Sequence, residues 1–395
     1  MITADLPYFQ DDPRLRREGR RFAGDPGPRR QGAAQMRSGP TTSHGVMEGN
    51  GAYNKHAKLQ AGGAALALPL LENAVRKMTL DLGDFPIVIA DYGSSQGKNS
   101  LAPMRVAISA LRTRLGPNRP ILVSHVDLPS NDFNTLFQVL DSDPDTYVLD
   151  EPNVFPCAIG RSFYGKVFPP HHVHLGWSSY AAVWLSRIPM LIPGHFFVHR
   201  SSGSIREAFA RQSAQDWEAF LSLRARELRA GGRLVVVLPT RRDDGSSGFE
   251  DIMDHANAVL AEMVDEGAIT TDERAGMVLG GYARRRRDLL APFMRDGRFR
   301  HLIVEHCDVT ELEDAAWTDY RRGGNAEALA SKQALFFRST FVPSLASALA
   351  RAGDAERCRA FGDRVEEGLK RRLARRPAAI RSLVGTIVLA KLDSA

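Results

Sequence analysis

The sequence has few of the features that mark secreted or membrane proteins. Its 395 residues include only three cysteines, Cys157, Cys307 and Cys358, which lie far apart and lack the spacing of metal ligands. We interpret them as reduced, buried thiols, which favours a cytoplasmic protein. No apolar run approaches the roughly 20 residues that cross a bilayer, and the longest candidate, residues 234–238, predicts a buried strand. We therefore expect no membrane partner.

Net positive charge is also small outside one segment. The net charge of the chain is +6, but residues 14–37 alone contribute +6, with eight arginines against Glu18 and Asp25. Residues 1–13 add three aspartates, so the remaining chain carries only +3. A basic excess confined to one end argues against nucleic-acid binding by the folded body, and no nucleic-acid partner is expected.

The first 45 residues lack any sustained periodicity and are rich in arginine, glycine and proline. We predict a disordered extension, with Met36 and Met47 as alternative true starts. An organelle transit peptide is the competing interpretation, because such leaders are rich in arginine and poor in acids. The acids at positions 5, 11 and 12 count against it.

Buried strands and helices alternate in the remaining chain, whose composition of 43% hydrophobic and 25% charged residues is typical of globular proteins. Apolar runs predict strands at residues 87–90, 121–126, 233–238 and 380–392, and a strand end at 158–159. Helical spacing predicts helices at residues 53–78, 99–115 and 205–230 and one from residue 131. Gly231 and Gly232 are expected to end the helix at 205–230. This order is typical of an α/β protein with a doubly wound sheet.

Two mostly helical segments, residues 249–300 and 315–350, break the alternation. We predict that they cover a ligand cleft. The predicted domains are a disordered extension at 1–45, a ligand-binding α/β domain at 46–248, 301–314 and 378–395, and a helical cap at 249–300 and 315–377.

Two strand ends carry the residues that a nucleoside ligand needs. The first predicted strand is followed by DYGSSQGKNS at residues 91–100, with Asp91, Gly93 and Gly97, and the second ends on Asp127. Carboxyl ends of parallel strands bind ligands at one edge of the sheet. We expect Asp127 to accept the two hydroxyls of a ribose, and the glycines to let the backbone approach the rest of the ligand.

The glycine spacing narrows the choice of ligand. The sequence lacks the Gly-Lys-Ser/Thr of triphosphate-binding loops, and the turn lacks the third glycine of dinucleotide binders. S-adenosylmethionine fits, because it has a ribose, an adenine and an amino-acid tail whose ammonium Asp91 would face directly or through water. A tight turn that serves only the sheet remains the alternative for this segment taken alone.

Five motifs in order give the chain a family resemblance. They are MEGNGAY at 47–53, DYGSSQGKNS at 91–100, DLPSNDFN at 127–134, SFYGKVFP at 162–169 and SSYAAVWLSRIP at 178–189. With them, the chain from about residue 47 to its end resembles the SABATH family, plant-type methyltransferases that use S-adenosylmethionine to methylate small carboxylic acids. A minor branch of that family methylates ring nitrogens of xanthines. The resemblance implies a class I methyltransferase fold, which is Rossmann-like, with an α-helical cap.

The resemblance also implies roles for individual residues. Gln60 and Trp184 would donate hydrogen bonds to the carboxylate of the substrate, a small and mostly apolar organic acid. Phe163 would pack on the adenine. The implied substrate pocket includes Val183, Tyr180, Met253 and Phe341. The implied cofactor-binding residues are Tyr53, Asp91, Gly93, Asn99, Asp127, Leu128, Ser162 and Phe163. A homodimer is compatible with the resemblance.

The implied reaction needs no general base. A carboxylic acid with a pKa near 4 is already ionised at neutral pH. The attack of the carboxylate oxygen on the sulfonium methyl is an in-line displacement, so the protein has to fix the distance and angle between these two groups. An amide and an indole are suitable neutral donors for that purpose. A lysine or arginine clamp would reduce the nucleophilicity of the carboxylate oxygen.

Several of these residues also have plainer interpretations. Trp184 suits an ordinary core position, Gln60 a solvated helix, and Phe163 with Tyr164 simple loop packing. We prefer the role of helix cap for Asp132.

Two clusters of cationic side chains are expected to be exposed. The histidines at positions 171, 172 and 174 lack further metal ligands, so a surface loop is favoured. Residues 284–287, four consecutive arginines, are interpreted as a solvated helix face, with attraction of an acidic substrate as the alternative.

Departures from the family pattern leave other functions open. His56 and Ala57, beside the motif at 47–53, and Val183, beside Trp184, differ from the residues usual in the family. These differences motivate a non-catalytic ligand-binding relative as one alternative. An N- or O-methyltransferase of a small heterocycle or phenol is another, and an RNA methyltransferase that uses the arginine-rich segment is a third. Residues 272–282 have Ala275 and Val278 where some members bind magnesium, so no metal is expected.

Overall fold

The computed structural model describes residues 47, 54, 58–81, 83–149, 151–350 and 353–393. All of them belong to one compact unit, residues 40–395. The predicted disorder of residues 1–45 and the predictions for Tyr53, His56 and Ala57 lie outside the described residues.

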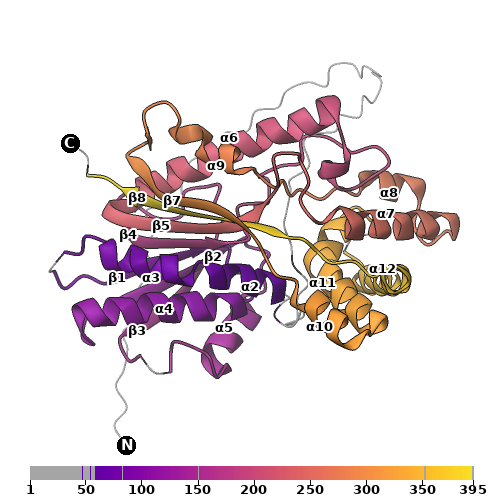
Figure 1. The fold of residues 1–395 in the computed structure, drawn as a ribbon. Helices are drawn as coiled ribbons and strands as arrows, with labels where there is room; N and C mark the ends of the chain where they lie inside the picture. The colour runs from indigo at the N-terminus through magenta and orange to yellow at the C-terminus, as the bar shows by residue number, and fades with distance from the viewer. Residues whose placement is uncertain are drawn as a thin grey trace, which may run out of the picture. The chain divides into compact units, whose positions relative to one another are not determined.

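An eight-stranded sheet in the order β3-β2-β1-β4-β5-β8-β7-β6 forms the centre of this unit (Figure 1). Its first five strands are parallel, and β8, β7 and β6 continue it in antiparallel pairs. The predicted doubly wound α/β sheet is thereby confirmed. The strands are β1 Ile87–Tyr92, β2 Ile121–Asp127, β3 Val154–Gly160, β4 Val173–Ser179, β5 Leu228–Thr240, β6 Arg298–Phe299, β7 Leu302–Glu311 and β8 Leu383–Lys391.

Alternation along the strands divides the core between the two faces of the sheet. Ile87 and Ile89 of β1 pack in one cluster with residues of α2–α5, whereas Val88 and Ala90 pack in another with residues of α6 and α9. Successive side chains of a strand point to opposite faces, which explains this division. The helices involved are α2 Lys58–Leu66, α3 Leu68–Lys77, α4 Lys98–Leu115, α5 Phe133–Ser142, α6 Gly203–Glu227 and α9 Arg286–Leu290.

A third cluster of buried apolar side chains joins helices beside the sheet (Figure 1). It includes residues of α7, α11 and α12. Leu289 and Phe293 pack with the sheet instead, although they belong to the predicted cap segment 249–300. The boundaries of the two domains stay a prediction. The remaining helices are α7 Glu250–Asp265, α8 Thr271–Gly276, α10 Ala315–Gly323, α11 Ala326–Ala346, α12 Ala355–Arg375 and the 3-10 turns η1 Val198–Arg200 and η2 Ala291–Phe293.

The glycine pair after α6 has a different role from the predicted one. The helix ends at Glu227 and β5 begins directly at Leu228, so Gly231 and Gly232 lie inside the strand. The β4–β5 register shifts there, from Val173 opposite Leu228 to Leu175 opposite Arg233. A Cβ on Gly232 would come within 2.8 Å of the His174 carbonyl oxygen. The glycines therefore permit an irregularity in the strand rather than end the helix.

The prediction of a surface loop is correct for His171 and His172 and wrong for His174. His174 is buried in β4, a strand that the sequence analysis missed, and its Nδ1 accepts a hydrogen bond from the Val88 backbone N–H at 3.0 Å. Burial lowers the pKa of His174 to about 4, so the ring is neutral at physiological pH.

The arginine run is likewise only partly exposed. Arg284 is 1% exposed, and its guanidinium donates to the carbonyl oxygens of Ala182 and Ser213 at 2.5 and 2.8 Å. It also lies over the ring of Trp217, 5.4 Å from its centroid. The prediction of a solvated face is therefore wrong for Arg284, whereas Arg286 and Arg287 are exposed.

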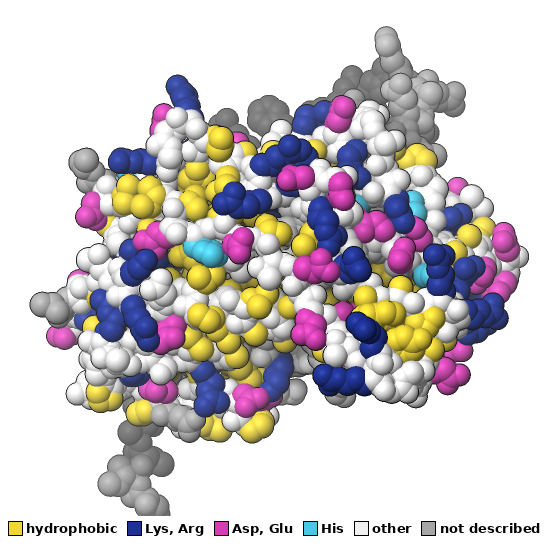
Figure 2. Space-filling view, in the orientation of Figure 1, with side chains coloured by type: hydrophobic (Ala, Val, Ile, Leu, Met, Phe, Trp, Pro, Cys, Tyr) yellow, Lys and Arg dark blue, Asp and Glu magenta, His cyan; other side chains and the backbone are white. Residues whose placement is uncertain are grey.

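The surface of the unit carries charges of both signs. Figure 2 shows basic and acidic side chains interspersed over the face in view, in line with the small net charge expected beyond residue 37. None of the described helices is both long and apolar enough to cross a membrane. The three cysteines are free and half-buried.

Candidate active site

The predicted cofactor residues lie where neighbouring parallel strands end. Asp91 is the penultimate residue of β1, Asp127 ends β2, and Ser162 and Phe163 follow β3. Because β3, β2 and β1 are adjacent and parallel, these positions share one edge of the sheet. The structure thus brings together the three segments that the sequence singled out.

The turn after β1 depends on Gly93. This residue has a φ of 92°, and a Cβ there would overlap the Cβ of Ala181. The same position lies 3.8 Å from Cε1 of Phe163. Gly97, with a φ of 88°, precedes α4, and Asn99 lies half-buried in the first turn of that helix. The close approach of three chain segments explains why only glycine fits at position 93.

Asp127 is held by the backbone of two segments. Its Oδ2 accepts from the Ser95 N–H and its Oδ1 from the Leu128 N–H, both at 2.7 Å. Burial, partly offset by these hydrogen bonds, raises the pKa of Asp127 to about 6. Each carboxylate oxygen can accept another hydrogen bond, so a fixed acceptor pair of this kind fits the hydroxyls of a ribose.

Asp91 belongs to a buried chain of polar side chains that the sequence analysis missed. Its Oδ2 accepts from Ser100 Oγ at 2.5 Å and lies 3.0 Å from His125 Nδ1. The His125 Nε2 lies 2.8 Å from the hydroxyl of Tyr147. These contacts fix the orientation of the Asp91 carboxylate. A histidine inside a buried strand gave no periodicity signal that could have identified this chain.

Aromatic packing and hydrogen bonds hold the loop after β3. The Phe163 ring lies 4.8 Å from the Tyr164 ring and 5.9 Å from the Phe220 ring, measured between centroids. Arg224 Nη1 donates to the Phe163 carbonyl at 2.8 Å, and Ser162 Oγ accepts from the Tyr164 N–H at 3.2 Å. Loop packing is therefore real, and it leaves Phe163 beside Gly93, while the contact of Phe163 with an adenine stays a prediction.

A cavity with about 730 Å³ of unfilled space, including its open mouth, lies beside this edge. Gln60 and Trp184 both line it. The four predicted pocket residues do so as well: Val183, Tyr180, Met253 and Phe341. The structure thus brings all six together, while their roles remain predictions. The other lining residues are Met47, Leu59, Phe197, His199, Pro239, Thr240, Ser247, Phe249, Leu279, Gly281, Ala283, Phe336 and Thr340.

Gln60 is fixed in the cavity wall by a distant helix. It is 4% exposed, and its Nε2 donates to Thr340 Oγ1 of α11 at 3.1 Å. Its Oε1 is buried without a hydrogen-bond partner among the described residues. The interpretation as a solvated helix residue is therefore wrong. Because an amide nitrogen carries two hydrogens, one N–H is left for a ligand.

Trp184 is half-buried and held through its backbone. Its carbonyl accepts from the Tyr164 hydroxyl at 2.6 Å, and it forms a bridge with Gly281. Within the described ranges, the indole N–H donates to no protein acceptor. The indole thus has a fixed position and a free donor at the cavity wall.

Other wall residues escaped the sequence analysis. His199, Thr240, Thr340 and Leu59 come from four separate segments of the chain. Residues scattered in this way form no motif, so the sequence offered no signal for them. Asp132, in contrast, caps α5 as predicted, because its carboxylate accepts from the Thr135 N–H at 3.1 Å. Among the described residues, no group of three or more His, Cys, Asp or Glu could hold a metal ion.

Replacing Gly93 with alanine should weaken cofactor binding strongly. The new methyl group would displace Ala181 and, with it, the segment that carries Trp184. We expect the Kd of S-adenosylhomocysteine, measured by calorimetry, to rise at least 10-fold, since overpacking costs about 1–3 kcal/mol. Gly116→Ala is the matched control, because Gly116 also has a positive φ, 73°, but has no atom within 4 Å of an added Cβ. Equal affinities in the two variants would contradict the packing argument.

Comparisons with known proteins agree with this geometry. The sequence profile of a family described as SAM dependent carboxyl methyltransferase matches residues 42–388. Gibberellic acid methyltransferase 2 of Arabidopsis thaliana is 26% identical over 68% of this chain and 75% of its own. Salicylate carboxymethyltransferase of Clarkia breweri is 27% identical over 75% of this chain and 84% of its own.

A solved structure also shows the same fold. It is that of loganic acid methyltransferase with SAH, which covers 88% of this chain and 99% of its own, with a TM-score of 0.70 and 21% identity. The predicted class I methyltransferase fold and the SABATH resemblance are confirmed. The chain belongs to the family of S-adenosylmethionine-dependent carboxyl methyltransferases.

Proposed function

We propose that the protein methylates the carboxylate of a small, mostly apolar organic acid, which Gln60 and Trp184 orient. Family membership makes it an S-adenosylmethionine-dependent methyltransferase of small organic acids. The observation that carries the residue assignment is that both neutral donors line one largely apolar cavity. The products would be a methyl ester and S-adenosylhomocysteine.

A short segment after β4 connects the two halves of the site. Ala181 packs against Gly93 of the cofactor turn, whereas Tyr180, Val183 and Trp184 line the cavity. The acid would therefore lie beside the edge at which we expect Asp127 to bind the ribose and Phe163 the adenine of the cofactor. When bound, S-adenosylmethionine supplies a methyl group activated by its sulfonium charge.

The walls of the cavity suit an anionic oxygen that must remain nucleophilic. A buried carboxylate needs hydrogen-bond donors, and the described lining includes the Gln60 amide and the Trp184 indole but no lysine or arginine. Neutral donors can fix one oxygen and leave the other one reactive. Fixing distance and angle in this way can contribute up to roughly 7–11 kcal/mol to lowering the barrier. The apolar side chains exclude water from the reacting groups.

The products of a substrate panel would test this proposal. The purified protein with labelled S-adenosylmethionine and a set of aromatic, terpenoid and fatty acids should yield labelled methyl esters that are cleaved by mild base. Mass spectrometry would identify the esters. Base-stable products alone would indicate a ring nitrogen or a phenol as the acceptor, and tight cofactor binding without turnover would indicate a non-catalytic relative. Either result would reject carboxyl methylation.

A further inference from the structure

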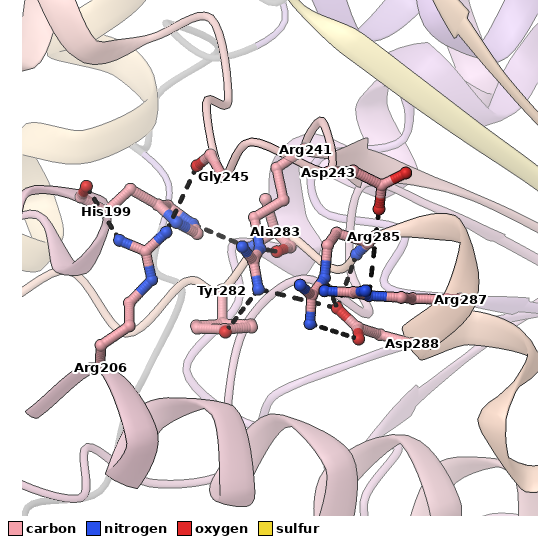
Figure 3. Close-up of polar contacts among 10 residues, drawn as sticks. All are labelled: His199, Arg206, Arg241, Asp243, Gly245, Tyr282, Ala283, Arg285, Arg287 and Asp288. Carbon is pink, nitrogen blue, oxygen red and sulfur yellow. Dashed lines mark hydrogen bonds and ion pairs between the residues drawn. The ribbon is translucent and has the colours of Figure 1, made fainter. Parts of the chain in front are cut away.

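His199 gives the cavity wall a polar group that the proposed reaction does not use. It lies in η1, is 8% exposed, and lines the cavity. Its Nε2 accepts a hydrogen bond from the Ala283 backbone N–H at 3.2 Å (Figure 3). Burial, and then repulsion from the guanidinium groups of Arg206 and Arg241, hold the pKa of His199 well below its ordinary value. The ring is therefore neutral.

A neutral ring that accepts at Nε2 carries its proton on Nδ1. This Nδ1–H is buried and has no partner among the described residues. A buried donor without an acceptor costs about 1–3 kcal/mol. Such a cost is tolerated when a ligand completes the hydrogen bond.

The nearby cations are already paired with the protein. Arg206 Nη1 donates to the His199 carbonyl at 3.0 Å, and Arg241 donates to the Ala283 carbonyl and the Tyr282 hydroxyl, both at 2.9 Å (Figure 3). Arg241 also lies 3.7 Å from the Asp288 carboxylate. These bonds fix the wall around His199 and leave its Nδ1–H as the available donor.

A second group on the same wall also lacks a partner. Thr240 is 1% exposed, lines the cavity, and has a hydroxyl with no hydrogen bond among the described residues. It forms a bridge with Arg284, the neighbour of the Ala283 that bonds to His199. Two unpartnered polar groups thus flank residues 283 and 284 on the cavity wall, His199 through its bond to Ala283 and Thr240 through its bridge to Arg284.

We propose that the acid carries an oxygen function besides its carboxylate, a hydroxyl or a carbonyl, that accepts from the Nδ1–H of His199. The hydroxyl of Thr240 adds a second hydrogen bond to the same function. The substrate class is thereby a hydroxy or oxo acid rather than a plain hydrocarbon acid. This inference rests on the proposed function, because the carboxylate is assigned to Gln60 and Trp184.

Matched pairs of acids would test the inference. Decanoic, cyclohexylpropanoic and phenylpropanoic acids would each be compared with their hydroxy and oxo derivatives at every position, with kcat/KM measured from the methyl ester. The wild type should prefer at least one oxygenated acid over its parent by about 10- to 100-fold, because the parent leaves the donor unpaired.

Variants would assign that preference to the wall. His199→Phe and Thr240→Val should each reduce the ratio, and His199→Phe should bring it close to 1. Two variants guard against loss of folding. His199→Gln can still accept from the Ala283 N–H, and Thr240→Val removes a hydroxyl that bonds to no described residue. Ser213→Ala is the matched control, because its hydroxyl is also buried and unpartnered but does not line the cavity.

Three outcomes would overturn the inference. The first is that the wild type prefers no oxygenated acid over its parent, and the second is that the preference survives in His199→Phe and Thr240→Val. An equal loss for parent and derivative would assign His199 to the carboxylate itself. If no acid yields an ester, the proposed function fails and this inference fails with it, whereas esters without discrimination reject the inference alone.

Discussion

Replacing Trp184 with phenylalanine should lower kcat/KM about 10- to 150-fold and leave the Kd of S-adenosylhomocysteine unchanged. The substitution keeps an aromatic ring in the wall but removes the indole N–H. A hydrogen bond to a charged group contributes about 1.5–3 kcal/mol, which corresponds to that range of rates. Steady-state kinetics with a methylated acid and calorimetry with S-adenosylhomocysteine would measure the two quantities.

Trp317→Phe provides the control for this substitution. Trp317 lies in α10, contacts Tyr320, and does not line the cavity. Its replacement should affect neither turnover nor cofactor affinity. If Trp184→Phe and Trp317→Phe have the same kinetics, Trp184 does not contact the substrate.

Replacing Asp127 with alanine should weaken binding of S-adenosylhomocysteine about 100-fold or more. Two ribose hydroxyls would each lose a bond to a charged acceptor, at about 1.5–3 kcal/mol a bond. Asp132→Ala is the matched control, because that aspartate caps α5 only five residues further on. It should reduce thermal stability by about 1 kcal/mol while leaving the Kd unchanged. Calorimetry that finds equal affinity in wild type and Asp127→Ala would remove Asp127 from the cofactor site.

The pH dependence of binding gives Asp127 a second signature. Burial raises the pKa of Asp127 from 3.8 to about 6, so below pH 6 its carboxyl group is mostly protonated in the free protein. Hydrogen bonds from the ribose hydroxyls favour the ionised carboxylate, so binding of the ligand would release this proton. The Kd should therefore fall as the pH rises from 5 to 7, by at most about tenfold per unit below pH 6. In Asp127→Ala this slope should be absent, and an identical slope in both proteins would assign it to another group.

The strands that the sequence predicted most directly contain at least four consecutive apolar residues. Residues 87–90 and 234–238 are of this kind, and both lie in the centre of the sheet. β4 was missed although it is equally buried, because its histidine, glycine and serines break the apolar pattern. Nδ1 of His174 accepts from a backbone N–H of β1, a contact between residues 86 positions apart that no local pattern records.

The candidate site likewise has one part that the sequence predicted and one part that it did not. Its cofactor edge follows strand ends directly, so short motifs predicted Asp91, Gly93 and Asp127 as neighbours. The cavity wall, in contrast, combines side chains from distant segments, such as His199, Thr240 and Thr340. Tertiary packing alone decides which of them meet. For Arg284 the sequence predicted exposure, because four consecutive arginines usually lie on the surface. The structure buries this one, since two carbonyl oxygens accept from its guanidinium and the Trp217 ring lies beneath it.

The hydrogen bond between Gln60 and Thr340 has a consequence for how this enzyme can change. Helix α11 supplies Phe336 and Phe341 to the cavity, and through Thr340 it also holds the Gln60 amide, which we propose orients the reacting carboxylate. Selection for a differently shaped acid would alter this helix and disturb the alignment of the nucleophile at the same time. Substrate range and turnover are therefore coupled on this wall, and new specificities should arise more readily through substitutions at Val183 or Met253.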